Sequence, residues 1–430
     1  MTKVAADRAV TSTLAFLAEL LADYYPRDFA VRLWDGTTWG AEPGYPANYT
    51  LVIRHPGSLR RMFLNSSERS LGEAFIRNDF DIEGELDAAF RMADYLLARR
   101  LGPAERLRHF CFLARLPWRG NPGATARTAS LSGALHSKKR DRQAVTFHYN
   151  VSNDFYALWL DKSMTYSCAY FSGEDDDLDT AQERKLDYIC RKLRLRPGER
   201  LLDIGCGWGG LILHAAERYG VEALGITLSG PQAELAKDRI RRAGLDGRCR
   251  VEVRDYRDLD GTGSFDKLAS VGMFEHVGVK LLPEYFLRAW RLLRPGGVFL
   301  NHGIADGRGP QPKGGESFID RFVFPDGELV PIDTTLRMAG QSGFEVRDVE
   351  SLREHYALTL RHWVRRLEAR QEEAIRLTDD VAYRIWRLYM SGAAHGFRTG
   401  RVNVYQALLA KLENGKCGLP LTRDDWYANP

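Results

Sequence analysis

The chain has 430 residues, of which 44% are hydrophobic and 27% are charged. This composition is typical of a globular protein with two or three domains, and the small net charge of +4 excludes a uniformly basic or acidic protein. The six cysteines form no Cys-x-x-Cys pair, which argues against a zinc ribbon or a disulfide framework and favours a reducing cytoplasm.

The first part of the chain predicts a small α+β domain. Residues 11–25 have the spacing of an amphipathic helix, and short strands are indicated at 29–40, around an Asp35-Gly36 turn, and at 49–56. A second helical pattern begins at residue 86, and helical character continues to about residue 116. We therefore expect a domain over residues 1–116.

No segment is apolar enough to predict a membrane span. The apolar run from Thr13 to Ala18 is interrupted by Glu19 and then by Asp23, before it reaches the length of a signal peptide or of a spanning helix. We expect a cytoplasmic protein whose contact with a membrane is peripheral, on the inner face.

Residues 117–144 are predicted to be a basic interdomain linker. Prolines and glycines between 117 and 123 interrupt the helical pattern. The wider stretch 99–142 is rich in Arg and Lys, with only Glu105 and Asp141 as acids. Such a stretch can attract an anionic membrane surface or a nucleic acid, although a solvated linker explains the charges equally well.

From residue 145 onward the pattern alternates between strands and helices. Strands are indicated by ERLLDI, VEALGIT, CRVEV, FDKLASV and GVFLN. This rhythm predicts an open, largely parallel, Rossmann-like α/β sheet with helices on both faces. The chain after Ser351 has a strongly helical pattern, so we expect residues 145–430 to form one larger domain with a helical C-terminal part.

A glycine-rich loop follows the first of these strands. Asp203 ends an apolar run and is followed by Gly205, Gly207, Gly209 and Gly210, a spacing that differs from the Gly-x-Gly-x-x-Gly of dinucleotide-binding folds. Glycines allow the backbone to approach a ligand closely and leave helix N-terminal amides open to it. A simple tight turn is the alternative, but the flanking strand and helix favour a ligand site.

Polar residues also follow the next two strands. The second strand ends in Gly-Ile-Thr-Leu-Ser, with Gln232 one turn into the next helix, and the third leads to Asp255 and Tyr256. Open α/β sheets bind ligands at the carboxyl edge of their strands. Asp255 and Tyr256 could hold an adenine by hydrogen bonding and stacking, and turn capping is the alternative for Asp255.

Six blocks of sequence resemble the cyclopropane-fatty-acyl-phospholipid synthases and the related mycolic acid cyclopropane synthases: MTYSCAYF, LLDIGCGWGG, GITLSGPQ, RDYRDL, SVGMFEHVG and NHGIA. The resemblance covers roughly residues 145–400. It implies a class I S-adenosyl-L-methionine (SAM)-dependent methyltransferase domain and a smaller, lipid-binding-like N-terminal domain. It also implies a SAM pocket lined by Tyr166, Ser167, Gly205, Gly207, Thr227, Leu228, Gln232 and Tyr256.

Four polar residues lie at loop positions where catalysis would require them: Cys168, Glu275, His302 and Tyr356. Glu275 and His302 follow the fourth and fifth strands, so both are expected at the ligand-binding edge of the sheet. The resemblance implies that these four residues bind a bicarbonate ion that acts as general base, helped by the backbone carbonyl of Ile304. Taken singly, each of the four is also compatible with a structural role.

The resemblance implies methyl transfer from SAM to the cis double bond of an unsaturated phospholipid acyl chain, followed by deprotonation to a cyclopropane. A methylene- or methyl-branched product is the alternative. A nucleic-acid methyltransferase is disfavoured because VGMFEHVG stands where the Asp/Asn-Pro-Pro-Tyr motif would follow the fourth strand, and an intact site argues against a non-catalytic lipid carrier. We expect an anionic membrane surface as partner, and the sequence leaves open whether the protein forms a homodimer.

Overall fold

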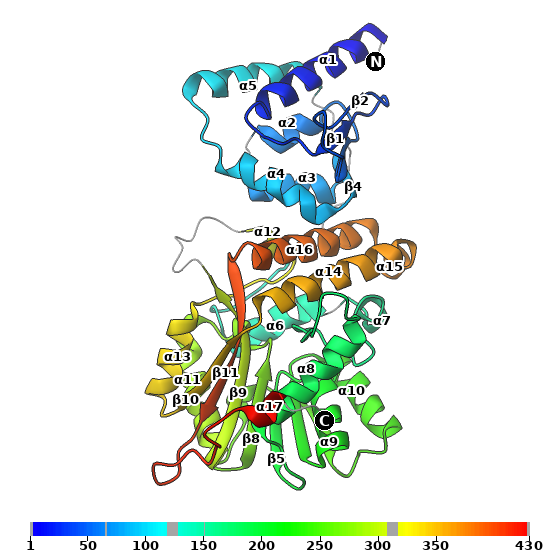
Figure 1. Ribbon diagram of the computed structural model, residues 1–430. Helices are drawn as coiled ribbons and strands as arrows, with labels where there is room; N and C mark the ends of the chain where they lie inside the picture. Colours follow the sequence, from blue (N-terminus) through cyan, green and yellow to red (C-terminus); the bar gives the residue numbers. More distant parts are fainter. Residues whose placement is uncertain (1–2, 65–66, 118–127, 150, 308–316, 428–430) are drawn as a thin grey trace. The chain divides into compact units, whose positions relative to one another are not determined.

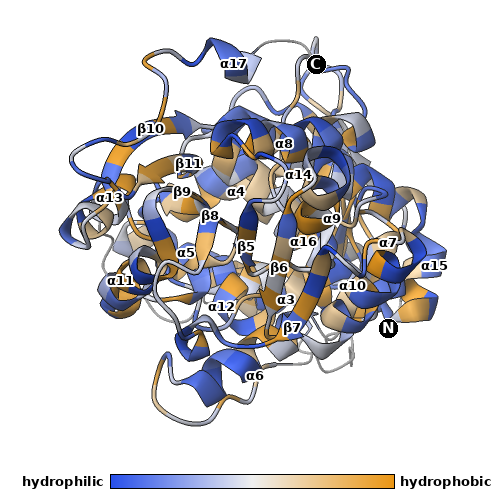
Figure 2. Cartoon of the chain, turned by 90° about the horizontal axis from the view of Figure 1, so that it is seen from below, coloured by the Kyte–Doolittle hydropathy of each residue, from blue (hydrophilic) through white to orange (hydrophobic). Residues whose placement is uncertain are grey.

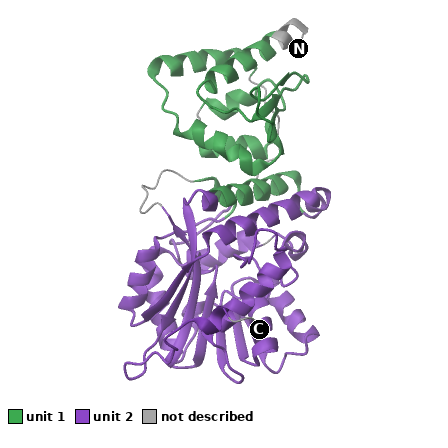
Figure 3. Cartoon of the chain, viewed as in Figure 1, with its two compact units in different colours: residues 1–128, 314–323, 378–395 green, residues 129–313, 324–377, 396–430 purple. Residues whose placement is uncertain are grey.

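The computed structural model describes residues 3–64, 67–117, 128–149, 151–307 and 317–427. The chain divides into two compact units, coloured separately in Figure 3. Unit 1 comprises Met1–Thr128, Gly314–Val323 and Thr378–His395, and unit 2 comprises Ala129–Lys313, Phe324–Leu377 and Gly396–Pro430. Each unit contains its own β-sheet.

Unit 1 has the α+β composition predicted for the N-terminal region. Its four-stranded sheet has the order β2-β1-β3-β4, in which β1 and β3 are parallel and the outer pairs are antiparallel. The strands are β1 (Phe29–Arg32), β2 (Thr38–Trp39), β3 (Tyr49–Ile53) and β4 (Phe80–Gly84). The helices are α1 (Lys3–Leu20), α2 (Ser58–Phe63), α3 (Glu68–Ile76), α4 (Leu86–Ala98) and α5 (Pro103–Arg115). The first helix thus begins and ends earlier than the predicted 11–25.

Two later segments also belong to unit 1: α12 (Phe318–Phe322) and the part of α16 (Asp380–Arg398) up to His395. Asp81 on β4 accepts hydrogen bonds from Arg384 at 2.9 Å and from Arg387 at 3.2 Å. The ring of Phe318 packs so closely on Gly72 that a Cβ added to this glycine would be only 2.5 Å from the nearest ring carbon. The structure therefore divides the chain differently from the predicted boundary at residue 145, because these contacts join segments far apart in sequence.

Unit 2 contains a seven-stranded sheet of order β10-β11-β9-β8-β5-β6-β7. Five strands are parallel: β5 (Arg200–Ile204), β6 (Glu222–Thr227), β7 (Cys249–Val253), β8 (Phe265–Val271) and β9 (Leu293–Asp306). Strand β11 (Val402–Ala410) is antiparallel to β9 and to β10 (Glu345–Ser351). The Rossmann-like prediction is confirmed. The C-terminal part contains the expected helices and, in addition, strand β11, which the sequence analysis did not predict.

Helices cover both faces of this sheet (Figures 1 and 2). Apolar side chains of α8 (Leu178–Leu193), α9 (Gly210–Tyr219) and α10 (Gly230–Arg242) pack on one face. Those of α11 (Leu282–Leu292) and α13 (Ile332–Gln341) pack on the other. The remaining helices of unit 2 are α6 (Lys138–Tyr149), α7 (Asn153–Ala157), α14 (Arg353–Ala369), α15 (Gln371–Leu377), α17 (Asp424–Tyr427) and the short η1 (Tyr256–Asp258), η2 (Phe274–His276) and η3 (Val279–Leu281).

The predicted linker, residues 117–144, is only partly a connection. Residues 118–127 lie outside the described part of the chain, but Lys138 begins helix α6, which belongs to unit 2. Arg140 donates to both carboxylate oxygens of Asp326, at 2.6 and 2.9 Å, and Lys138 pairs with Asp258. Within the described ranges, no helix is long and apolar enough to cross a membrane.

Candidate functional site

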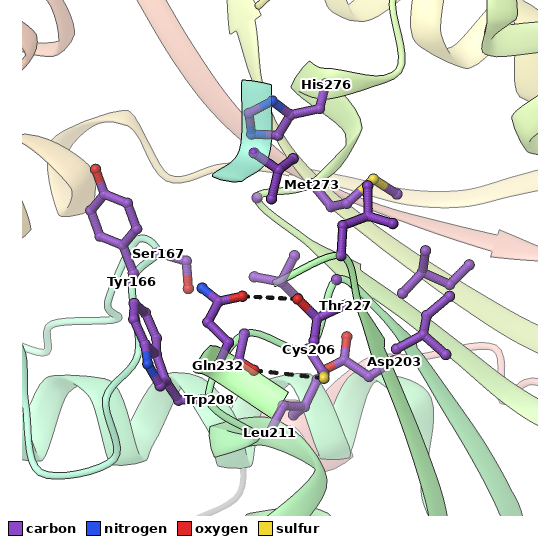
Figure 4. A pocket seen from close by; sticks show the side chains of 18 of the residues that line it. Tyr166, Ser167, Asp203, Cys206, Trp208, Leu211, Thr227, Gln232, Met273 and His276 are labelled. Atoms are coloured by element: carbon purple, nitrogen blue, oxygen red, sulfur yellow. Dashed lines mark hydrogen bonds between the residues drawn. The ribbon is translucent and has the colours of Figure 1, made fainter. Parts of the chain in front are cut away.

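A pocket opens at the carboxyl edge of the unit 2 sheet, where β5, β6, β7 and β8 end (Figure 4). Loops at this edge carry most of its polar groups, as expected for an open parallel sheet. The eight residues that the resemblance assigns to SAM all line this one pocket: Tyr166, Ser167, Gly205, Gly207, Thr227, Leu228, Gln232 and Tyr256.

The glycine loop after β5 has backbone angles that only glycine adopts readily. Gly205, Gly207 and Gly209 have φ angles of 88°, 53° and 81°. A Cβ on Gly207 would meet no protein atom within 4 Å, so its place is open to a ligand. Helix α9 begins directly after this loop, so its first amide groups face the same side of the sheet.

Helix α8 holds the segment that carries Tyr166 and Ser167. The side-chain amide of Gln182 donates to the carbonyl oxygens of Thr165 at 3.2 Å and Ser167 at 2.8 Å. The ammonium group of Lys185 donates to Oγ of Ser167 at 2.8 Å. Two side chains one helical turn apart therefore fix this wall of the pocket.

Lys185 and Asp203 place two opposite charges at the pocket wall, although their side chains are only 1% and 3% exposed. Burial lowers the pKa of Lys185 to about 8, an effect that the charge of Asp161 and, to a smaller extent, that of Asp203 partly offset. Burial raises the pKa of Asp203 to about 7, and the charge of Lys185 opposes this shift. Oδ1 of Asp203 has no hydrogen-bond partner among the described residues, so the pocket offers a buried acceptor.

Thr227 and Gln232 are oriented before any ligand binds. The Thr227 hydroxyl donates to Oε1 of Gln232 at 2.9 Å and accepts from the backbone N–H of Ser229 at 3.1 Å. Ser229 in turn caps helix α10. Figure 4 shows the amide nitrogen of Gln232 pointing away from Thr227, on the side of Ser167.

Asp255 lines the pocket and also caps η1, the alternative role considered above. Its carboxylate accepts from the Arg257 side chain at Nε (2.9 Å) and Nη2 (2.7 Å), and from the Arg257 backbone N–H at 2.9 Å. Arg257 also donates to Asp141 of helix α6 at 2.8 Å. The ring of Tyr256, packed edge-on against Tyr285 at 5.4 Å, remains at the pocket wall.

Asp141, Val145, Tyr149 and Trp208 are among the lining residues that the sequence interpretation missed. The first three lie on α6, whose start was assigned to the linker. Trp208 stands within the glycine loop, where its indole N–H donates to Asn153 at 2.8 Å and its carbonyl accepts from Arg239 at 2.7 Å. A large aromatic residue inside a glycine-rich turn was the one signal that could have identified it.

Glu275 lies in η2, directly after β8. Its Oε1 accepts from the backbone N–H of Ile304 at 2.7 Å, whereas Oε2 is buried without a partner among the described residues. Burial raises the pKa of Glu275 to about 7, and the hydrogen bond from Ile304 partly opposes that shift. The carboxyl group therefore keeps its proton to a higher pH than an exposed glutamate does, which suits a group that exchanges hydrogen bonds with a bound anion.

His302 lies within β9, not in a loop after it as the sequence pattern suggested, because this strand continues to Asp306 in its pairing with β11. The side chain is fully enclosed. Its Nδ1 lies 3.2 Å from the amide nitrogen of Gln406; because an amide nitrogen only donates, Nδ1 accepts and the ring proton resides on Nε2. Nε2 is buried and has no partner within the described ranges. Burial lowers the pKa of His302 well below its usual value, so the ring is a neutral donor.

Cys168 and Tyr356 both lie against Leu352. The thiol of Cys168 is directed to the carbonyls of Ala169 at 3.3 Å and Leu352 at 3.7 Å, and burial raises its pKa. It therefore stays protonated and is no nucleophile. The backbone N–H of Tyr356 donates to the same Leu352 carbonyl at 3.0 Å.

Backbone hydrogen bonds connect this pair to Glu275. The N–H of Leu352 donates to Val404, and Val404 pairs with Ile304 in the sheet. These bonds link Cys168 and Tyr356 through Leu352 and Val404 to Ile304 and Glu275, and His302 lies two residues before Ile304 on β9. None of the five residues assigned to the bicarbonate site lines the pocket, but Met273 and His276 on either side of Glu275 do.

Comparison with known proteins agrees with this geometry. The family described as mycolic acid cyclopropane synthetase matches residues 136–407. A Pseudomonas putida protein described as a probable fatty acid methyltransferase is 40% identical over 92% of this chain and 95% of its own. The Escherichia coli cyclopropane-fatty-acyl-phospholipid synthase is 37% identical over 67% of this chain and 74% of its own.

Among solved structures, the mycolic acid cyclopropane synthase CmaA1 in complex with SAH and CTAB superposes with a TM-score of 0.58 and is 36% identical. The match covers 62% of this chain and 97% of that one. The glycine loop, the strand-end polar groups and these similarities together show that the chain belongs to the mycolic acid cyclopropane synthetase family of SAM-dependent methyltransferases.

Proposed function

We propose that this protein transfers a methyl group from SAM to the cis double bond of an unsaturated phospholipid acyl chain and that loss of a proton then closes a cyclopropane ring. The proposal is carried by one observation: two buried polar atoms, Oε2 of Glu275 and Nε2 of His302, have no partner among the described residues. Glu275 lies in η2, which follows β8, and His302 lies on the neighbouring strand β9. Buried polar groups are normally satisfied, so these two indicate a polar ligand.

The pocket residues fit SAM. The open space at Gly207 and the first amides of α9 accommodate a closely packed ligand with a negatively charged group. The unpartnered oxygen of Asp203 suits an ammonium group, and the ring of Tyr256 offers a surface for a purine. When bound, SAM supplies a methyl group attached to positively charged sulfur.

Glu275, His302, Cys168 and Tyr356 would hold a bicarbonate ion, together with the carbonyl of Ile304. Neutral His302 presents an N–H, and Glu275, with its pKa raised to about 7, holds a proton on its carboxyl group for part of the time at neutral pH. Both are donors suited to a small oxyanion in a dry site. Bicarbonate bound there would supply the base that accepts the proton lost from the methylated chain.

The surroundings also suit the developing positive charge on the acyl chain. Tyr166 lines the pocket, and Phe274, next to Glu275, is buried against Gly303. Aromatic faces stabilise a desolvated cation by roughly 0.5–2 kcal/mol each. By contrast, Tyr170 and Phe171 stack on His355 of helix α14 and pack as core.

A methylene- or methyl-branched acyl chain is the second candidate product. It is favoured by the extent of similarity, because the Pseudomonas putida protein described as a fatty acid methyltransferase matches 92% of this chain, against 67% for the Escherichia coli cyclopropane synthase. The cyclopropane and the methylene product both require methyl transfer and the loss of one proton from the transferred methyl group. They differ in that a hydride first shifts onto the cationic carbon on the way to the methylene product, and a methyl-branched chain then requires a separate reductase that saturates the methylene group.

The test uses purified protein, SAM and a phospholipid with monounsaturated acyl chains. Proton NMR of the product should show upfield ring protons and loss of the alkene signals for a cyclopropane. Vinylidene signals would instead identify the methylene product. Removing dissolved CO2 should lower turnover and added bicarbonate should restore it, and equal rates with and without bicarbonate would contradict its role.

A further inference from the structure

Helix α5 (Pro103–Arg115) of unit 1 is anchored along one side only. His109 and Leu113 are buried. The rings of His109 and Phe112 pack against the ring of Phe16 of α1, with centroid-to-centroid distances of 5.2 and 6.2 Å. Pro103 in the first turn and Glu105, which accepts from the backbone N–H of Gly102 at 2.9 Å, define its start. The helix is therefore held in place by its buried face.

The opposite face of α5 is apolar and exposed. Leu107 is 64% and Phe110 is 56% exposed, and Ala104, Cys111 and Ala114 are exposed as well. These residues recur at helical spacing, so they form one continuous stripe. We call this set of five residues the α5 stripe.

Arginines border the α5 stripe on both sides. At about 100° per residue, Arg106 falls beyond one edge, next to Phe110, whereas Arg108 and Arg115 fall beyond the other. All three are exposed. Arg108 pairs with Glu19 at 2.9 Å, but Arg106 has no ion pair among the described residues. An apolar stripe flanked by arginines is the arrangement of helices that lie in a membrane interface.

Two basic residues at the other end of the cationic stretch 99–142 are engaged within the protein. Lys138 pairs with Asp258, and Arg140 binds Asp326 through two hydrogen bonds. Arg99 donates to the carbonyl of Leu20 and to Glu105. Lys139 and Arg142 of α6 are also exposed, so the feature that distinguishes α5 is the apolar stripe that lies between its arginines.

We propose that the α5 stripe and its flanking arginines dock the protein on an anionic lipid bilayer, with Leu107 and Phe110 inserted at the boundary between headgroups and acyl chains. This inference rests on the proposed function, since an enzyme that modifies acyl chains has to reach them in a bilayer. An anionic bilayer matches both the apolar stripe and the arginines, because its acyl region accepts apolar side chains and its headgroups attract positive charge.

The test is co-sedimentation of the full-length protein with phosphatidylglycerol vesicles and with phosphatidylcholine vesicles. One variant carries Leu107→Ser and Phe110→Ser, and a second carries Arg106→Gln and Arg115→Gln. Each pair should weaken binding to phosphatidylglycerol about tenfold or more, and roughly 0.5 M salt should weaken binding of the wild type. The matched controls are Leu421→Ser, at a side chain that is 98% exposed, and Arg250→Gln, whose side chain is 73% exposed; both lie in unit 2 and should bind like the wild type.

Binding by both variants equal to that of the wild type would overturn the inference, as would equal binding to the two kinds of vesicle. A change in oligomeric state without a change in vesicle binding would also overturn it, because the stripe would then meet a second copy of the chain. Turnover on detergent-dispersed lipid should be the same in wild type and variants. Absence of acyl methylation in every sample would contradict the proposed function and leave vesicle binding as a separate result.

Discussion

The exchange Glu275→Gln removes one buried titrating group while keeping the shape of the side chain. In the folded protein the pKa of Glu275 is raised from 4.5 to about 7 by burial, so the folded state keeps a proton that the unfolded state has lost. Stability therefore falls as pH rises from about 4.5 to about 7 and levels off above. Since one pKa unit corresponds to about 1.4 kcal/mol, Glu275 makes the wild type lose about 3 kcal/mol over this range.

The glutamine side chain of the variant does not titrate, so this loss should be absent from it. The assay is denaturant unfolding of both proteins in CO2-free buffers at pH 5, 6, 7 and 8. Asp203 and the other groups with shifted pKa values titrate in both proteins, so the difference between the two pH profiles of the free energy of unfolding isolates the contribution of Glu275. Glu183→Gln, at an exposed position on α8, is the control and should follow the wild type. Identical pH profiles for wild type and Glu275→Gln would refute the assignment of a protonated, buried Glu275. Turnover of this variant should fall roughly 10²–10⁴-fold, with SAM affinity by calorimetry unchanged.

Three further changes test the cofactor pocket, each by calorimetric SAM binding and thermal unfolding. Gly207→Val should abolish SAM binding, while Gly198→Val, at a similar positive φ with nothing near its Cβ, should show the same modest loss of stability and normal binding; normal binding by Gly207→Val would contradict the site. Lys185→Met should weaken SAM binding about tenfold or more. Its control is Lys192→Met, at an equally buried lysine of α8 that does not line the pocket, and this variant should lower stability but leave SAM affinity unchanged. Equal losses of SAM affinity in the two variants would exclude a specific role for Lys185. Arg257→Gln should also weaken SAM binding, because it removes the hydrogen bond from the Arg257 guanidinium to Asp141 that holds α6 at the pocket. Unchanged SAM affinity would show that α6 does not cover the bound cofactor.

The cofactor pocket was predictable because its signals are local in sequence. A strand, a run of glycines and a helix start define the loop at Gly205 and Gly207, and parallel strands bring their carboxyl ends to one edge. Thr227 and Tyr256 follow directly from the next two strands. The location of residues that follow strand ends can thus be predicted from the sequence alone.

Residues that act through tertiary packing were not predictable in this way. Lys185 stands in the middle of a helix among charged neighbours, where a lysine is usually solvated; its burial depends on the sheet that packs against α8. Asp255 looked like a free carboxylate, and only the structure shows Arg257 against it. Strand β11 was hidden by the helical pattern around it, because a short apolar run does not distinguish a buried strand from a helix.

The division into units was hidden for a similar reason. Asp81 pairs with Arg384 and Arg387, residues about 300 positions later in the chain, and no local pattern indicates such a contact. The cationic stretch 99–142 was likewise interpreted as one segment. In the structure its two ends belong to different units and have different partners.

The central claim is that the protein adds one carbon from SAM to the double bond of an acyl chain, with Glu275 serving the proton loss. The most direct measurement expresses the wild type and Glu275→Gln in a host that lacks this activity and analyses the membrane fatty acids by mass spectrometry and proton NMR. We expect the wild type to convert monounsaturated chains to products one CH2 unit heavier, without alkene protons and with upfield ring protons, and the variant to accumulate little of them. Unchanged monounsaturated chains in cells that contain folded, SAM-binding wild-type protein would contradict the account.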